Sequence, residues 1–192
     1  MGKDRETEAD SRQTKEQFKR LERRLVAKGA IIDYYHDIVQ VPNGNIVTWD
    51  YIHHKGAAAV VPVTEDGRIL MVRQFRNALD RETWEIPAGG LESPDEPTIN
   101  AAARELAEET GYRSEDLELL ITIRTTVAFC NEKIDIYVAR DLKAGSQHLD
   151  EDEFIGVKAM TVEELTDMIY SGRIEDSKTV AAIMSYKNKY CR

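Results

Sequence analysis

The pattern of apolar and polar residues in the first quarter of the chain is typical of short strands. Residues 30–41 and 46–53 are rich in Ile, Val and Tyr, and residues 42–45 between them read Pro-Asn-Gly-Asn. An Asn-Gly pair supplies the positive φ angles that a tight hairpin turn needs. We therefore predict a β-hairpin over residues 30–53.

Upstream of this hairpin the spacing changes. Phe18, Leu21 and Leu25 recur at i, i+3 and i+7, as residues do on one face of a helix. This spacing predicts a helix over residues 13–28.

The rest of the chain carries signals for further strands and for helices. Pro97 suits the first turn of a helix and Gly111 its end, while Thr161 and Glu164 form a capping box. Helices are predicted over residues 97–110, 161–170 and 177–190. The apolar face of the first is predicted at Ile99, Ala102, Ala103 and Leu106. Strands are predicted over residues 57–63, 68–75, 84–86, 117–127, 134–139 and 154–160. This order fits a mixed sheet with helices on both faces.

Composition narrows the class of protein. The 192 residues include 35 acidic and 26 basic side chains, so the net charge is −9 and general nucleic-acid binding, which needs clustered Lys and Arg, is not expected. No apolar run approaches the roughly 20 residues of a membrane span, and the start lacks an apolar signal-peptide region. Cys130 and Cys191 form no metal-binding motif. We expect a cytoplasmic enzyme or ligand-binding protein that contacts neither nucleic acid nor a membrane.

Three glutamates of one predicted helix stand close together. Glu105, Glu108 and Glu109 are spaced by three and four residues, which places Glu105 on ridges adjacent to both of the others. Like charges there repel each other, and Arg104, four residues before Glu108, can offset one of them. A divalent cation would offset the remaining pair, and oxygen ligands favour Mg²⁺ or Mn²⁺ over zinc. The alternative is a solvated acidic helix face.

A longer pattern surrounds these glutamates. Residues 90–112 read GLESPDEPTINAAARELAEETGY: a glycine, a glutamate six residues later, then Arg-Glu-Leu, Glu-Glu and Gly-Tyr. With this unbroken spacing the chain resembles the Nudix hydrolases at their family motif, the Nudix box. The resemblance implies an α/β (α+β) fold: an αβα sandwich with a mixed sheet, formed by residues 56–192 and carrying the box as loop–helix–loop. Residues 1–55 would add an N-terminal arm and hairpin.

The resemblance also implies roles for the box residues. It indicates a hydrolase that uses Mg²⁺, with Mn²⁺ as an alternative, on a nucleoside diphosphate linked to another group. Glu105 and Glu109 are expected to hold the cation, which neutralises the pyrophosphate and lowers the pKa of a bound water. Glu108 is expected to bind a further cation or orient its neighbours, and Arg104 to hold the glutamates in place.

In this family a main-chain carbonyl commonly completes the metal site, and its assignment here depends on register. The strict spacing selects Gly90 as the first residue of the box, whereas Gly89 directly follows the Pro-Ala pair, as in many relatives. The carbonyl is assigned to Ala88, with that of Gly89 as the alternative.

Two segments before the box resemble the ADP-ribose and ADP-sugar pyrophosphatase branch of the family. They are Val-Arg-Gln-Phe-Arg at residues 72–76 and Trp-Glu-Ile-Pro-Ala-Gly at residues 84–89. From this resemblance, Arg76 is expected to contact substrate phosphate or else to form a buried salt bridge. Glu85 is expected to bind a substrate hydroxyl or else to be a structural ion-pair partner.

The N-terminal hairpin resembles the same branch, in which the equivalent segment joins a domain-swapped homodimer and lines the partner's active site. A homodimer with a swapped hairpin is therefore expected. Trp49 stands where a relative places an aromatic side chain that stacks on adenine. Packing of Trp49 within the hairpin is the alternative.

A second acidic cluster, Asp-Glu-Asp-Glu, occupies residues 150–153. Four adjacent carboxylates would normally be a solvated loop. In this branch of the family, however, a mobile loop at this place supplies a glutamate that acts as a base or binds metal. Glu153 matches it best, because Glu153-Phe154-Ile155 resembles the family's Glu-aromatic-aliphatic sequence, and Glu151 is the second candidate.

The loop at residues 125–132 departs from the family pattern. Many bacterial ADP-ribose enzymes have a proline at the position of Val127, in a loop that recognises the terminal ribose. Glu132, at the end of this loop, is a further candidate for substrate binding. The expected reaction is hydrolysis of ADP-ribose to AMP and ribose 5-phosphate. The alternatives are another substrate, such as ADP-glucose, GDP-mannose or an oxidised nucleotide, or non-catalytic binding of ADP-ribose.

Overall fold

The computed structural model describes residues 17–149 and 154–191, and the chain divides into two units. The first unit holds the residues up to His54 together with Thr126–Asn131. The second holds Lys55–Thr125 and the residues from Glu132 onward. A segment from late in the sequence therefore belongs to the N-terminal unit, so no single cut in the chain separates the two.

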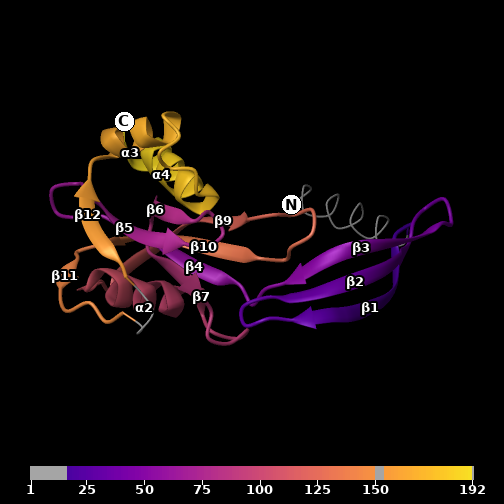
Figure 1. Cartoon of the computed structure of the whole chain (residues 1–192). Helices are drawn as coiled ribbons and strands as arrows, with labels where there is room; N and C mark the ends of the chain where they lie inside the picture. The colour runs from indigo at the N-terminus through magenta and orange to yellow at the C-terminus, as the bar shows by residue number, and fades with distance from the viewer. Residues whose placement is uncertain (1–16, 150–153, 192) are drawn as a thin grey trace, which may run out of the picture. The chain divides into compact units, whose positions relative to one another are not determined.

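The first unit is a three-stranded antiparallel sheet in the order β1-β2-β3, shown in indigo and purple in Figure 1. The predicted hairpin is confirmed: β2 (Asp33–Gln40) pairs with β3 (Ile46–His53) through a turn in which Gly44 has φ 87°. A positive φ is unfavourable for a residue that has a Cβ, so glycine at this position allows the chain to reverse direction in a tight turn.

The predicted helix over residues 13–28 is wrong for the part that the structure describes. That segment is strand β1 (Lys19–Lys28), which pairs with β2. The register shifts twice, between Arg20 and Glu22 and between Leu25 and Ala27. Each shift inserts a residue that breaks the strict alternation of a strand. The resulting apolar spacing imitates that of a helix.

A partly buried ion pair links β1 to β2 and favours their observed register. Arg23 donates from Nε and Nη2 to the two carboxylate oxygens of Asp37, at 2.6 Å each. Asp37 is 9% exposed, and the hydrogen bonds from Arg23 lower its pKa. The Arg23 guanidinium also lies 3.5 Å from the centre of the Tyr51 ring. Such a paired and stacked arginine specifies one register.

The second unit is built on two larger sheets and one small one. Its strands are β4 (Ala57–Pro62), β5 (Ile69–Arg76), β6 (Arg81–Glu85), β7 (Ala88–Gly90), β8 (Tyr112–Arg113), β9 (Asp116–Arg124), β10 (Lys133–Arg140), β11 (Lys143–Ala144) and β12 (Gly156–Met160). They form sheets in the orders β7-β4-β10-β9, β12-β5-β6 and β11-β8. Because β4 and β10 are parallel while the other pairs are antiparallel, the predicted mixed sheet is confirmed.

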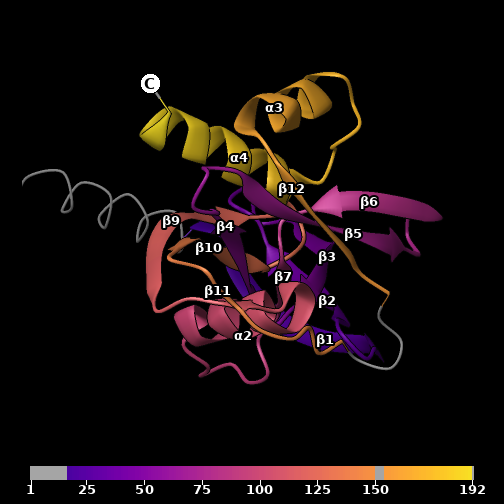
Figure 2. The same cartoon turned by 90° about the vertical axis from the view of Figure 1, so that its left-hand side faces the viewer.

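Helices cover both faces of the β7-β4-β10-β9 sheet, as Figure 2 shows. Helix α2 (Thr98–Thr110) lies on one face, and α3 (Val162–Tyr170) and α4 (Ser177–Tyr190) lie on the other. The predicted end signals are confirmed: Gly111 is left-handed at φ 74°, and Thr161 and Glu164 form both hydrogen bonds of the capping box. In the part of the chain that the structure describes, no helix is both long and apolar enough to cross a membrane.

Strand β4 divides the core between these two layers. Ala57, Ala59 and Val61 pack in the main cluster with α3 and α4, whereas Ala58 and Val60 pack towards α2. Alternate side chains of a strand point to opposite faces, so a strand buried on both sides is apolar throughout. Small alanines in β4 let the layers approach closely around the site described next.

The predicted apolar face of α2 needs a correction. Ala102 and Leu106 are buried as expected, but Ile99 is 42% exposed and Ala103 is only partly buried. The buried face instead runs through Ala101, Ala102, Glu105, Leu106 and Glu109. Two carboxylates therefore stand where the apolar pattern alone gives no reason to bury them.

Candidate active site

The site begins with the two buried glutamates of α2. Glu105 is 8% exposed and Glu109 is 3% exposed, one helical turn apart on the same face. Glu108 points elsewhere, with 41% of its side chain exposed. The alternative of a solvated acidic face is therefore wrong for Glu105 and Glu109. Since burying carboxylates costs several kcal/mol each, the site needs compensating positive charge or donors.

The main chain of strand β7 lies next to both carboxylates. The Ala88 N–H donates to Glu109 Oε2 at 3.0 Å. A Cβ on Gly89 would lie 2.1 Å from Glu105 Oε1 and 2.5 Å from Oε2, a distance that real atoms do not reach. The two carboxylates thus lie against adjacent residues of one strand.

This geometry bears on the choice between the two glycines. A Cβ on Gly90 would meet nothing closer than the Gly56 carbonyl oxygen at 4.0 Å. A side chain at residue 89 would displace the Glu105 carboxylate from its position against β7, whereas one at residue 90 would not. Gly90 satisfies the motif spacing without this close contact.

Arg104 links the glutamates to the loop before the helix. Its Nη1 donates to Glu105 Oε1 at 2.6 Å and to Glu108 Oε2 at 3.1 Å, and its Nη2 donates to the Gly90 carbonyl at 3.1 Å. Its Nε lies 3.6 Å from a carboxylate oxygen of Glu96 but forms no hydrogen bond within the described residues. One guanidinium thus serves several carboxylates, and the site is left strongly negative.

The donor set fits a hard divalent cation. Within the described ranges, no group of three or more His, Cys, Asp or Glu side chains is arranged to hold a metal. Mg²⁺ does not need such a group, because one or two carboxylates suffice when waters and substrate phosphates complete its shell. Glu105 and Glu109 provide two carboxylates, and the lack of a side chain at Gly89 keeps the adjoining main chain accessible to them.

Glu85 forms a second buried carboxylate site, of a different kind. It is 2% exposed and accepts hydrogen bonds from Arg76 Nε and Nη2 at 2.7 and 2.6 Å, and from Thr83 Oγ1 at 2.6 Å. Lys178 Nζ also donates to it. Burial raises the pKa of Glu85, but the bonds from Arg76 and the charge of Lys178 outweigh this and hold the pKa at about 2.

The structure therefore joins Arg76 and Glu85 as an ion pair, one of the two expectations for each, and contact of either residue with substrate stays a prediction. Together with Lys178 they line a pocket of about 460 Å³ at the end of the β5–β6 hairpin. Nη1 of Arg76 is not engaged by Glu85, and 40% of the Arg76 side chain is exposed.

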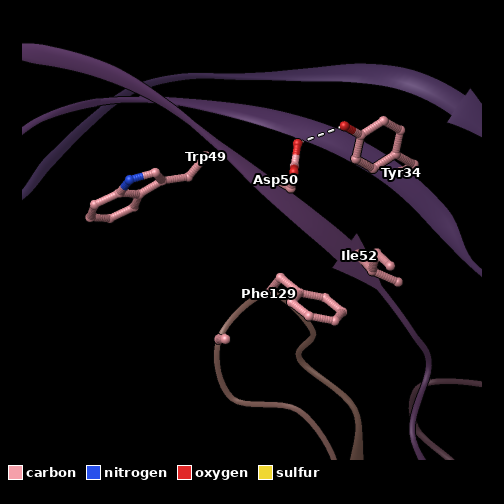
Figure 3. Close-up of a pocket in the computed structure, with 6 residues that line it drawn as sticks. Tyr34, Trp49, Asp50, Ile52 and Phe129 are labelled. Carbon is pink, nitrogen blue, oxygen red and sulfur yellow. Dashed lines mark hydrogen bonds between the residues drawn. The ribbon is translucent and has the colours of Figure 1, made fainter.

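The first unit contains a pocket of its own, of about 550 Å³, shown in Figure 3. Its lining residues are Tyr34, Trp49, Asp50, Ile52, Ala128 and Phe129. Trp49 is 48% exposed, and the Tyr34 hydroxyl donates to Asp50 Oδ1 at 2.6 Å. The Trp49 ring also lies 6.1 Å from that of Phe18, centre to centre, so it packs in part.

A loop from late in the sequence completes this pocket. The Ile52 N–H donates to the Phe129 carbonyl at 2.7 Å, and the Asn131 N–H donates to the Ile52 carbonyl at 3.3 Å. The Asn131 side chain bonds both main-chain groups of His54, at 2.7 and 3.0 Å. Sequence reasoning flagged this loop through Val127, which is 82% exposed, but it missed Tyr34, Asp50 and Phe129.

The remaining predicted residues are placed as follows. Glu132 belongs to the second unit, where it accepts a hydrogen bond from Thr125 Oγ1 at 2.6 Å. Glu151 and Glu153 lie outside the described residues. Phe154, the first described residue after them, is 83% exposed.

Comparison with known proteins assigns this arrangement to a family. The NUDIX domain model matches residues 53–183. The chain is 40% identical to an ADP-ribose pyrophosphatase of Bacillus subtilis (strain 168) over 173 residues, covering 86% of this chain and 93% of the relative. It is 31% identical to the ADP-ribose pyrophosphatase of Mycobacterium tuberculosis over 172 residues, covering 88% and 82%.

Two further comparisons extend the picture. A methanol dehydrogenase activator of Bacillus methanolicus is 41% identical over 160 residues, covering 82% of this chain and 86% of that one. The crystal structure of an ADP compounds hydrolase superposes with a TM-score of 0.79 at 21% identity, covering 90% of this chain and 93% of the other. At that identity the superposition supports the fold.

Proposed function

This chain belongs to the Nudix family and is a pyrophosphohydrolase, and from that premise we propose that it hydrolyses ADP-ribose to AMP and ribose 5-phosphate with Mg²⁺. The observation that carries the proposal is the burial of Glu105 and Glu109 against Ala88 and Gly89. Two relatives named ADP-ribose pyrophosphatase, which align over most of their length, support the substrate.

Glu105 and Glu109 hold the cation in this proposal, with the Ala88 carbonyl, or that of Gly89, as a main-chain ligand. The bound cation, Mg²⁺ or Mn²⁺, neutralises the pyrophosphate and lowers the pKa of the attacking water. Arg104 keeps Glu105 and Glu108 in position because its Nη1 donates to a carboxylate oxygen of each. Glu108, the more exposed of the three, orients its neighbours or holds a further cation.

Proton removal from the attacking water is assigned to a carboxylate outside the helix. The box glutamates are engaged with the cation, so a separate carboxylate is chemically reasonable as the base. Glu153 has this role in the proposal and Glu151 is its alternative, on the strength of their place in the sequence.

Substrate recognition is assigned to three places. Trp49 stacks on adenine in the pocket of Figure 3, where its half-exposed ring supports the role. Arg76 presents Nη1 to a substrate phosphate while Glu85 holds the other edge of its guanidinium. Glu132, tied to Thr125, contacts the substrate beside the loop that carries Val127.

The protein is proposed to be a cytoplasmic homodimer in which the N-terminal hairpin lines the partner's active site. The first unit leaves many large apolar side chains at least 40% exposed: Phe18, Leu21, Leu25, Val26, Ile31, Ile32, Ile46 and Trp49. Exposed apolar surface of this extent favours a partner. Sedimentation as a monomer at micromolar concentration would contradict the dimer.

A substrate screen tests the proposed function. ADP-ribose, ADP-glucose, GDP-mannose and an oxidised nucleotide are incubated with Mg²⁺, and the phosphate released by an added phosphatase is measured. We expect the highest kcat/KM with ADP-ribose and no activity after chelation of the metal. A higher kcat/KM with GDP-mannose or the oxidised nucleotide would overturn the substrate assignment, and inactivity towards all four would overturn the reaction.

A further inference from the structure

The second unit has a pocket that the proposed reaction does not use. It has a volume of about 430 Å³ and lies between the exposed side of α2 and the two-stranded sheet β8–β11. Ala103 and Ala107 give it a small apolar wall, and Arg113, Ser114 and Lys143 line it from the sheet. Pockets of about 300–1,000 Å³ are the usual size for small ligands.

Two cations face each other at this pocket. Arg113 and Lys143 are directly opposite residues of the antiparallel pair β8–β11. Like charges in such positions destabilise a sheet. Among the residues that the structure describes, neither side chain has an ion-pair or hydrogen-bond partner. Both residues are exposed, and an anion bound between them would relieve the repulsion of the two adjacent charges.

Hydrogen bonds to main-chain groups fix the segments that line this pocket. Gly111 ends α2, and the Gly145 N–H donates to its carbonyl at 2.7 Å, which fastens the end of β11 to the end of the helix. Ser114 Oγ donates to the Arg140 carbonyl and accepts from the Asp116 N–H at 3.0 Å. The pocket is therefore a built part of the unit.

We propose that this pocket binds the phosphate of a sugar phosphomonoester. The Arg113 guanidinium offers paired donors to phosphate oxygens, and Lys143 adds a compact positive charge. The Ala103 and Ala107 methyl groups pack against the apolar face of the sugar. Glu115, the one acid among the lining residues, accepts hydrogen bonds from sugar hydroxyls and disfavours bare polyanions.

Arg104 connects this pocket with the candidate active site. Arg104 is one of the residues that line the pocket, and its Nη1 donates to Glu105 and Glu108. A ligand here therefore acts on the residue that positions the glutamates. Both products of the proposed reaction are phosphomonoesters, so a product bound in this pocket would regulate the enzyme by feedback.

The test is calorimetric titration of the intact chain without divalent metal, in the presence of EDTA, with ribose 5-phosphate, AMP and inorganic phosphate as separate probes. The variant is Arg113→Ala/Lys143→Ala. Its matched control, Lys158→Ala/Arg173→Ala, removes the same two charge types from exposed positions elsewhere. We expect saturable binding of ribose 5-phosphate to the wild type and the control, and binding at least about tenfold weaker to the variant, because charge-assisted hydrogen bonds are lost.

The probes distinguish the sources of the phosphate group. Tighter binding of ribose 5-phosphate or AMP than of inorganic phosphate supports a sugar phosphomonoester, and equal binding of inorganic phosphate overturns the sugar contact. No saturable binding to the wild type, or equal affinity in the double variant, overturns the site. If the double variant does not fold, judged by circular dichroism, Lys143→Ala replaces it under the same criteria. Because no metal or turnover is involved, failure here leaves the hydrolysis test of the proposed function unaffected.

Discussion

The Glu85 region and the Glu105–Glu109 region of the second unit both bury carboxylates, but they compensate the negative charge differently. Glu85 receives Arg76, Lys178 and Thr83 around its two oxygens. Glu105 and Glu109 instead lie against the main chain of β7, and a single arginine, Arg104, is shared between Glu105 and the more exposed Glu108. A carboxylate enclosed by protein cations is neutralised within the fold and stabilises it. A carboxylate pair set against a glycine and a main-chain N–H has the composition of a cation site.

The contrast between the two carboxylate regions is tested most directly by removing the charge of Glu109. Glu109→Gln removes one charge from the proposed cation site, so kcat for ADP-ribose should fall by at least ~10³-fold, since charge at the metal supplies several kcal/mol of transition-state stabilisation. The thermal midpoint without metal should be kept or raised, because a buried charge is lost, and Mg²⁺ should protect the variant less than the wild type. Steady-state kinetics and thermal unfolding with and without Mg²⁺ check both. Near-normal turnover in the folded variant, with exposed Glu163→Gln as control, would reject the site.

Glu85 should show the opposite profile. Glu85→Gln leaves Arg76 and Lys178 without their counter-charge, and breaking a buried ion pair typically costs about 3–5 kcal/mol in unfolding free energy. Urea unfolding measures this loss. The control is Glu82→Gln on the same hairpin, where Glu82 is 48% exposed and pairs with Arg73, and its cost should stay below about 1 kcal/mol. Equal effects of the two substitutions would show that Glu85 is not the stabilising member.

Acid should act on the same residue. The pKa of Glu85 is about 2 in the folded protein and 4.5 ordinarily, so it binds its proton more readily when unfolded. Its contribution to stability is therefore present above the ordinary pKa and is lost as pH falls from about 5 towards 2. The difference in unfolding free energy between wild type and Glu85→Gln should shrink over this range. A difference that is constant with pH would contradict the assigned pKa.

The smallest effect is expected from a substitution in the first unit. Trp49→Ala should raise KM for ADP-ribose by about tenfold with a smaller change in kcat, because stacking on a base is worth about 1–3 kcal/mol and acts before and during chemistry alike. Phe75→Ala, which removes an aromatic ring of similar exposure from the second unit, serves as control. An unchanged KM with normal stability would return Trp49 to a packing role.

Much of the fold follows from local signals in the sequence. The helix at Ser177–Tyr190 has the predicted bounds, and α2 ends at the predicted glycine. The spacing of the Nudix box also marks Glu105 and Glu109 as expected cation ligands, and these are the two glutamates of the motif helix that the structure buries. These features depend on neighbours in sequence, through caps, turns and helical period, so one chain is enough to predict them.

Features that depend on distant residues were not predictable in this way. The two bulges of β1 follow from its pairing with β2, including the contact of Arg23 with Asp37, and no local rule places them. The close contact of Gly89 with the Glu105 carboxylate appears only when helix α2 is packed against strand β7. The second cation at Glu85, Lys178, is likewise far along the chain and reaches the carboxylate only in the folded unit.

The loop at residues 126–131 determines when, during synthesis of the chain, the first unit can finish folding. Chains emerge from the ribosome N-terminus first, and early segments begin to fold before later ones exist. Strand β3 is made early. The main-chain groups of Ile52 and His54, however, bond to the main chain of Phe129 and Asn131 and to the Asn131 side chain, which are translated much later. The N-terminal sheet is thus the first part of the protein to be synthesised, but it must wait with an open edge until most of the second unit has been translated.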